Sequence, residues 1–250
     1  MAAAQPHTPA RAETASSRRG SASFKKSVPR EYLESVVVAV ILALFIRTFV
    51  VQAFKIPTGS MEPNLLIGDH LLVNKVIYSP SAIPFEDRIL AKKPIQRGHV
   101  VVFKFPEDPT RDFIKRVIGL PGETVEIRDK TVLINGQALE ESYAHFLEPP
   151  LHRDDPEYAL RSEGPRDNWG PEVVPAGHLF VMGDNRDNSR DSRFWGFLPR
   201  DQVKGRALLV YWSYEASREE YHRTGWVEQI RDTFSAFGKT RWSRFFHLIR

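Results

Sequence analysis

The chain has 250 residues, of which 42% are hydrophobic and 26% are charged, an ordinary balance for a protein that buries a core. It contains no cysteine, which excludes disulfides, thiol catalysis and cysteine-ligated metal sites. The formal net charge of +4 is small for this length, so composition does not argue for a nucleic-acid-binding protein.

The N-terminal segment is rich in alanine, serine, threonine and proline and almost free of large apolar side chains. Such a composition cannot bury enough apolar surface to fold, which predicts a disordered tail over residues 1–31. Within residues 1–30 the acid Glu13 stands against six bases: Arg11, Arg18, Arg19, Lys25, Lys26 and Arg30. The tail is therefore strongly basic.

A long apolar run follows over residues 32–54 and is uninterrupted from Val36 to Ile46. It reaches the roughly 20 residues that a bilayer core requires, which predicts a transmembrane anchor. Because the basic tail precedes it, the N-terminus is expected in the cytoplasm and the following domain outside. A cleaved signal peptide is disfavoured, because the run is long and no small-x-small site follows it cleanly. A buried core helix stays open, because Arg47 shortens the strictly apolar run.

From about Gln52 onward the chain changes to short β-like runs with glycine and proline between them. Asn135-Gly136 is a strong signal for a tight hairpin turn. We therefore predict a mainly β, antiparallel domain over residues 55–213. Its predicted strands are His70–Tyr78, His99–Phe105, Asp112–Gly119, Glu123–Arg128, Thr131–Ile134, His178–Asp184 and Arg206–Trp212.

Two segments depart from this pattern. Residues 140–172 hold five prolines and nine acidic against three basic residues, which predicts a surface insertion or a loose excursion from the β core. Residues 214–250 predict a short helical, basic and amphipathic C-terminal tail, which can lie at a membrane interface or pack on its own domain. The end of this tail places Trp242, Phe245, Phe246, Leu248 and Ile249 among Arg241, Arg244, His247 and Arg250.

One serine stands in an unusual place, in the stretch IPTGSMEP shortly after the apolar run. The hydroxyl of Ser60 needs a base to become a nucleophile, and no histidine pattern signals a catalytic triad or a zinc site. Lys115 lies within an apolar predicted strand, and by alternation Phe113 and Val117 share its face. Burial of that face would lower the pKa of Lys115 and leave an amine that can act as a general base. The alternative is a lysine that points outward from an edge strand.

Short motifs occur in order along the chain: IPTGSMEP (56–63), GDHLLVNK (68–75), RGHVVVF (97–103), KRVIGLPGE (115–123) and GDNRDNSRDSRFWG (183–196). With the apolar run, they closely resemble the bacterial type I signal peptidases, membrane-bound Ser-Lys endopeptidases that cut signal peptides from exported proteins. The resemblance covers the anchor and essentially all of residues 52–212. It implies a barrel-like arrangement of the sheet and a reaction that uses neither a metal nor an organic cofactor.

The resemblance also assigns roles to residues. Ser60 matches the nucleophile and Lys115 the general base. The Thr58 hydroxyl and the backbone N–H of Ser60 match the oxyanion hole, which stabilises charge on the scissile carbonyl. Four further residues match supporting positions: Ser189 would help to orient the lysine, Asp191 and Arg193 would form a structural charged pair, and Asp184 would shape the loop beneath the site.

The same residues allow a simpler interpretation. The charged residues of the last motif, including Asp184, Asp191 and Arg193, can form a salt-bridged turn with no other role. Arg190 departs from the family pattern, in which an acid or a small residue is common between Ser189 and Asp191. This departure leaves the local electrostatics open but not the assignment of the motif.

The resemblance implies that the substrates are exported preproteins with small residues, typically alanine, at the first and third positions before the cut. Shallow apolar pockets would select them, with Phe54, Ile56 and the segment Leu65–Leu72 as candidate lining. Ser60 lies nine residues after Val51, so the site is expected close to the outer membrane surface. The expected location is the bacterial plasma membrane, spanned once, with the domain on the periplasmic side. Membrane lipid is then a partner and nucleic acid is not.

Two other functions stay open. The chain could be a maturation peptidase of the same clan with one dedicated substrate. It could also be an inactive anchored β module that only binds export partners, although intact Thr58, Ser60 and Lys115 argue against this. The soluble self-cleaving repressors of the clan are disfavoured, because they carry a DNA-binding domain in place of an anchor.

Overall fold

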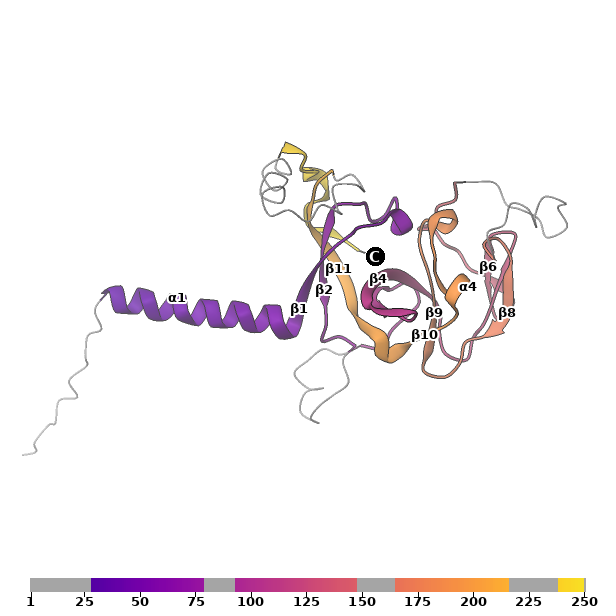
Figure 1. Cartoon of the computed structure of the whole chain (residues 1–250), viewed down its shortest axis with the longest axis horizontal. Coiled ribbons are helices and arrows are strands. Elements are labelled where there is room, and N and C mark those ends of the chain that lie inside the picture. The colour runs from indigo at the N-terminus through magenta and orange to yellow at the C-terminus, as the bar shows by residue number, and fades with distance from the viewer. Residues whose placement is uncertain (1–27, 79–92, 148–164, 216–237, 250) are drawn as a thin grey trace, which may run out of the picture. The chain divides into compact units, whose positions relative to one another are not determined.

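The computed structural model describes residues 28–78, 93–147, 165–215 and 238–249 (Figure 1). The predicted tail therefore lies outside the described residues up to residue 27. The chain divides into two compact units, Met1–Leu42 and Ala43–Arg250, and each is described by itself.

The apolar run forms helix α1 (Val28–Phe45), which a π-helical turn, η1 (Ile46–Val50), continues. This helical stretch of 23 residues is long and apolar enough to cross a membrane. No residue of α1 is buried within its own unit. The helix begins before the predicted anchor, because Pro29 suits a first helical turn. It also ends before residue 54, because Val51 is already extended at φ −126° and ψ 148°.

The second unit is built on an eight-stranded antiparallel sheet of order β1-β2-β11-β3-β4-β9-β10, with β12 paired to β11. Figure 1 shows the long strand β11 running beside β2 in the part nearest β1. The strands are β1 (Val51–Lys55), β2 (Asp69–Asn74), β3 (Val100–Phe105), β4 (Asp108–Gly119), β9 (His178–Met182), β10 (Leu198–Pro199), β11 (Val203–Ser213) and β12 (His247–Leu248).

A second, four-stranded sheet has the order β7-β6-β5-β8. Its strands are β5 (Thr124–Arg128), β6 (Thr131–Ile134), β7 (Gln137–Ala138) and β8 (Trp169–Val173). Asn135 and Gly136 join β6 to β7 with φ of 52° and 80°, the left-handed conformations that the tight turn requires. One-turn helices complete the fold: η2 (Gly59–Met61), η3 (Arg186–Asn188), α4 (Ser192–Trp195), η4 (Arg200–Gln202) and η6 (Trp242–Arg244).

Apolar side chains from the two sheets share one core cluster. Ile118 of β4 and Phe180 of β9 pack in it together with Val125 of β5 and Trp169 of β8. Ile118, Val125 and Phe180 are fully buried, so contact with the large sheet buries the inner face of the small sheet. The loop between β9 and β10 thus starts at the junction of the two sheets.

The prediction of a mainly antiparallel β domain is confirmed, and each predicted strand is present within a few residues. Strands β1, β7, β8, β10 and β12 were not predicted. The expected loose excursion over residues 140–172 is wrong at both described ends. Its last residues form most of β8, and His145 at its start pairs with Asn185. The rest of it, residues 148–164, lies outside the described residues.

The C-terminal tail differs from the expected helix in its described part. Residues 238–249 hold the 3-10 turn η6 and the strand β12, which pairs with Leu209 and Val210 of β11. The free backbone edge of β11 at these residues provides hydrogen bonds that a short isolated helix lacks. Residues 216–237 of the predicted tail lie outside the described residues.

Candidate active site

Ser60 lies in the one-turn helix η2, between β1 and β2. The turn is packed into the protein: Gly59, Ser60 and Met61 are all buried. Met61 belongs to the core cluster beneath the sheet, and its carbonyl accepts a hydrogen bond from the backbone N–H of Leu65. Met61 therefore holds the turn of Ser60 in place by packing in the core, and it has no chemical role of its own.

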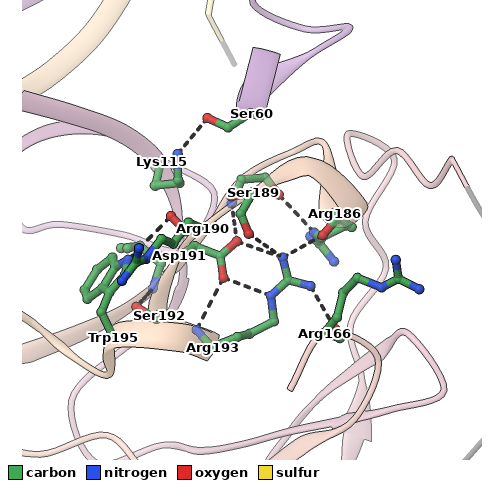
Figure 2. A network of polar contacts seen from close by, with 12 residues as sticks. Ser60, Lys115, Arg166, Arg186, Ser189, Arg190, Asp191, Ser192, Arg193 and Trp195 are labelled. Atoms are coloured by element: carbon green, nitrogen blue, oxygen red, sulfur yellow. Dashed lines mark hydrogen bonds and ion pairs between the residues drawn. The ribbon is translucent and has the colours of Figure 1, made fainter. Parts of the chain in front are cut away.

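Lys115 lies in the middle of β4 with its side chain inside the protein, only 3% exposed. Figure 2 shows its side chain pointing toward Ser60. The Nζ atom donates to Ser60 Oγ at 2.7 Å and to the carbonyl oxygen of Ile114 at 3.0 Å. Phe113 and Val117 share one apolar cluster, as strand alternation predicted for the face of Lys115. The outward-pointing alternative for this lysine is therefore wrong.

The surroundings of Lys115 change its acidity. Burial lowers the pKa of its ammonium from 10.5 to about 8, because a charge loses its hydration inside the protein. The carboxylates of Asp191 and Asp184 act in the opposite direction, and the guanidinium of Arg193 adds to the lowering. At pH 7 about a tenth of the lysine is therefore uncharged and able to accept a proton, far more than for a lysine of ordinary pKa.

The loop after β9 holds the backbone of the turn that carries Ser60. The backbone N–H of Asn185 donates to the carbonyl oxygen of Ser60 at 3.1 Å, and its side-chain amide donates to the carbonyl of Gly59 at 3.1 Å. At Gly183, a Cβ atom would collide with Ser189 Oγ and with the Ser60 carbonyl oxygen. Only glycine lets the two segments approach this closely.

Two further residues singled out in the sequence are Ser189 and Thr58. Ser189 is buried, and its hydroxyl helps to lower the pKa of Asp191, but among the described residues its Oγ makes no hydrogen bond of normal geometry. The expected orienting contact from Ser189 to Lys115 is thus not present as a hydrogen bond. Thr58 is exposed and extended, and its side chain does not cap η2. Its hydroxyl is therefore available to a molecule outside the chain.

Asp191 and Arg193 form the expected pair, and both side chains are buried. Arg193 Nε donates to Asp191 Oδ1 at 2.8 Å, and its Nη2 donates to Oδ2 at 2.9 Å. Burial would raise the pKa of Asp191, but the charge and hydrogen bonds of Arg193 and the N–H of Gly183 hold it below its ordinary value. Arg193 also donates to the carbonyls of Arg166 and Arg186 (Figure 2). Because Arg166 lies shortly before β8, the pair connects the loop after β9 to the small sheet.

Asp184 pairs with an arginine that sequence reasoning did not single out. Arg116 follows Lys115 directly, and its guanidinium donates twice to the buried Asp184 carboxylate, at 2.8 and 2.7 Å. It lies 4.1 Å from the ring centre of Tyr143 and also donates to the carbonyl of Gly98. Asn64 donates to the same carboxylate at 2.9 Å. Asp184 therefore joins the strand of Lys115 to the loop that follows Ser60.

The charged residues of the motif 183–196 form ion pairs within the motif and also with other parts of the chain. Arg186, 1% exposed, pairs with Glu141, and Asp187 pairs with Lys130 at 2.7 Å. These partners come from other elements, so the motif is a junction rather than a self-contained turn. Arg190, in contrast, is exposed and pairs with Glu107 on the surface, 3.0 Å away. Such an exposed pair has little effect on stability.

The predicted pocket residues divide between the core and the surface. Ile56, Leu65 and Leu71 are at most 2% exposed and pack in one cluster, whereas Phe54 is partly buried against it. Leu66, Ile67 and Leu72 of the candidate segment are also only partly buried, so they keep apolar surface toward solvent as Phe54 does. Among the described residues no group of three or more histidine, aspartate or glutamate side chains is placed to hold a metal ion.

The chain is similar to known peptidases over most of its length. The family described as "Signal peptidase, peptidase S26" matches residues 29–212. A signal peptidase I of Leptolyngbya laminosa is 42% identical over 189 residues, which cover 73% of this chain and 79% of that protein. A signal peptidase I of Aquifex aeolicus is 35% identical, with 74% and 84% covered.

A solved structure is also similar in sequence. The crystal structure of a signal peptidase I from Enterococcus faecalis is 34% identical and superposes with a TM-score of 0.34 over 46% of this chain and 97% of the other. The match of the family over most of the sequence, with relatives at 35% and 42% identity, settles its membership. The chain belongs to the signal peptidase family, peptidase S26, and is a peptidase.

Proposed function

We propose that this chain is a membrane-anchored serine endopeptidase that removes signal peptides with Ser60 as nucleophile and Lys115 as general base. One observation carries the proposal: the buried Nζ of Lys115 lies 2.7 Å from Ser60 Oγ. A hydroxyl next to a desolvated amine is the arrangement that a Ser-Lys mechanism requires. The pKa of Lys115, lowered to about 8 by burial, supports its role as the base.

The reaction follows from these groups. The neutral amine of Lys115 takes the proton of Ser60 Oγ while the oxygen attacks the scissile carbonyl carbon. The exposed Thr58 hydroxyl and the backbone N–H of Ser60 would donate to the oxygen that becomes negative. The protonated Lys115 then gives its proton to the departing amine, which leaves an ester on Ser60. Water hydrolyses that ester in a second step with the same base.

Substrate selection is the second part of the proposal. Signal peptides that end in Ala-x-Ala would bind as an extended strand, because their small side chains fit shallow apolar pockets and larger ones do not. The test is to mix the detergent-solubilised full chain with an Ala-x-Ala preprotein and to follow its shortening by mass spectrometry. We expect cleavage after the second alanine, with and without a chelator. A folded chain that leaves this preprotein intact would favour a peptidase with one dedicated substrate or a binding module.

The pH dependence of the reaction should report the lysine. Below its pKa of about 8 Lys115 is protonated and cannot act as a base. We therefore expect kcat/KM to rise about tenfold per pH unit on the acidic side and to level off above a midpoint near 8. Initial rates from mildly acidic to alkaline pH measure this profile. A profile that stays flat across this range would show that the proton acceptor is not a lysine of this pKa.

The location of the protein forms the third part of the proposal. Within the described residues one helix is long and apolar enough to cross a membrane, which fits a single-pass membrane protein. We place the basic tail in the cytoplasm and the peptidase domain on the periplasmic side of the bacterial plasma membrane, because the basic residues precede the span. A protease added outside spheroplasts should digest the domain and spare the tail. Digestion of the tail alone would reverse the orientation.

The C-terminal segment supports a contact with lipid through exposed aromatic side chains, not through the basic amphipathic helix that the sequence predicted. Trp242, Phe246 and Leu248 are 69%, 68% and 61% exposed, which is unusual for side chains of this size. Arg241 and Arg244 instead turn inward and bond to the domain. The segment thus presents aromatic groups, which favour a membrane interface. Brominated lipids should quench wild-type fluorescence more than that of Trp242→Phe, and equal quenching would place this segment in water.

A further inference from the structure

The C-terminal segment returns to the loop that follows Ser60. Strand β12 pairs with β11, and the backbone N–H of Ile249 donates to the carbonyl of Leu208 at 2.9 Å. The side chain of Ile249 packs against the core cluster that contains Met61 and Leu65. The segment is therefore in contact with the apolar residues that hold the turn of Ser60 in place.

Arg244 makes a two-point contact with a fully buried carboxylate in the same loop. Its Nε donates to Asp69 Oδ1 at 3.1 Å and its Nη2 to Oδ2 at 2.6 Å, and the Asp69 side chain is 0% exposed. The same Nη2 atom donates to the carbonyl of Asn64 at 2.8 Å. Asp69 Oδ2 also accepts the backbone N–H of Leu66 at 2.8 Å. Arg244 thus ties together both ends of the loop Asn64–Asp69 with charge-assisted hydrogen bonds.

The opposite side of this loop is bonded to the strand of the lysine. Asn64 donates to the Asp184 carboxylate at 2.9 Å, and that carboxylate is held by Arg116, the neighbour of Lys115. The loop is therefore fixed from two sides, by Arg244 on one and by the Arg116–Asp184 pair on the other. The described structure places the turn of Ser60 directly before this loop, joined to it by the Leu65-to-Met61 hydrogen bond.

We propose that Arg244 is a positioning residue that acts through Asp69 and Asn64 to keep Ser60 Oγ within hydrogen-bond reach of Lys115 Nζ. The inference rests on the proposed Ser-Lys mechanism. A reacting oxygen that moves by about 1 Å can lose about 100-fold in rate, even when the cause lies outside the reacting groups. Without Arg244, the Asp69 carboxylate is buried without a counter-charge and keeps only the backbone N–H of Leu66 among these bonds, so the loop must move to let water reach it.

The test measures kcat and KM of the full chain in detergent with the Ala-x-Ala preprotein. For Arg244→Ala we expect kcat to fall about 10- to 100-fold, because the loop that positions Ser60 would move and Ser60 Oγ would leave hydrogen-bond reach of Lys115 Nζ. Added guanidinium ion should restore part of kcat in this variant by occupying the vacated site. The same concentration of potassium chloride should restore none.

Arg128→Ala is the matched control, because Arg128 on β5 is 64% exposed and its ion pair among the described residues is with the nearby Glu126 on the surface. Its kcat should equal that of wild type, with no response to guanidinium. Arg244→Lys keeps the charge but loses the two-point geometry, so its kcat should lie between those of wild type and Arg244→Ala. It also keeps the test decisive if the alanine variant does not fold.

The possible outcomes separate the inference from the proposed function. If wild type does not cleave, the proposed function fails before Arg244 is tested. If wild type cleaves and folded Arg244→Ala keeps its kcat, with only a lower free energy of unfolding, the residue is structural and the inference is overturned. Wild-type kcat in Arg244→Lys would overturn it as well, because that variant lacks the two-point contact.

Discussion

Ser60→Ala should abolish cleavage of an Ala-x-Ala preprotein, with a loss in kcat of at least about 10⁴-fold, because no other group can form the acyl intermediate. The fold should survive, since the change removes a single oxygen atom and Lys115 keeps its bond to the carbonyl of Ile114. Cleavage is followed by mass spectrometry and the fold by circular dichroism. The two measurements together separate a missing nucleophile from a missing structure.

Ser35→Ala provides the control for this variant. Ser35 lies on α1, and its hydroxyl only donates to the carbonyl of Glu31 in the same helix. This variant should cleave at the wild-type rate. If Ser60→Ala also cleaved at that rate, another residue would be the nucleophile, and the geometry of Ser60 and Lys115 would need a different explanation.

Lys115→Met should also lose cleavage, yet the protein should become more stable near neutral pH. The unfolded lysine binds its proton up to about 10.5, whereas burial lowers the pKa of the folded one to about 8. Below pH 8 folding must therefore desolvate an ammonium, and this cost disappears as the pH rises from 8 to 10.5. Methionine avoids the cost but loses two hydrogen bonds, so we expect a gain of about 1–2 kcal/mol.

Urea unfolding at neutral and at alkaline pH measures this effect. The stability difference between Lys115→Met and wild type should shrink as the pH passes the lysine pKa, because wild type then folds with a neutral amine. Lys104→Met on β3 is the control, since Lys104 is exposed and its charge stays in water. A Lys115→Met protein that still cleaves would assign the base elsewhere, and one that is less stable at every pH would contradict the desolvation argument.

Much of the large sheet was predictable, because its strands alternate apolar and polar residues or run apolar throughout. Strand β1 was missed because most of its residues fall within the predicted anchor, which extended to residue 54. Strand β8 was missed because Pro171 and Glu172 disfavour a strand locally, and only pairing with β5 in the small sheet makes these residues extended. In both segments, pairing with a neighbouring strand determines the extended conformation, which the local sequence pattern does not predict.

The site shows the same limit. Strand alternation predicted that Lys115 lies on an apolar face, and the resemblance to the family predicted that Ser60 acts together with it. Asp184 is separated from its partner Arg116 by 68 positions in the sequence. Asp69 is separated from its partner Arg244 by 175 positions. No local spacing signals such contacts. A charged residue in a turn is usually hydrated, so the buried Arg186 also had no sequence signal.

The wide sequence separation of these contacts has a consequence for refolding. The loop Asn64–Asp69 is held by Tyr143, Asp184 and Arg244, which lie 79 to 180 residues further along the chain. Bringing such distant segments together requires closing long loops, which slows folding. After dilution from denaturant, secondary structure should therefore return well before peptidase activity, and the interval would time the assembly of the site.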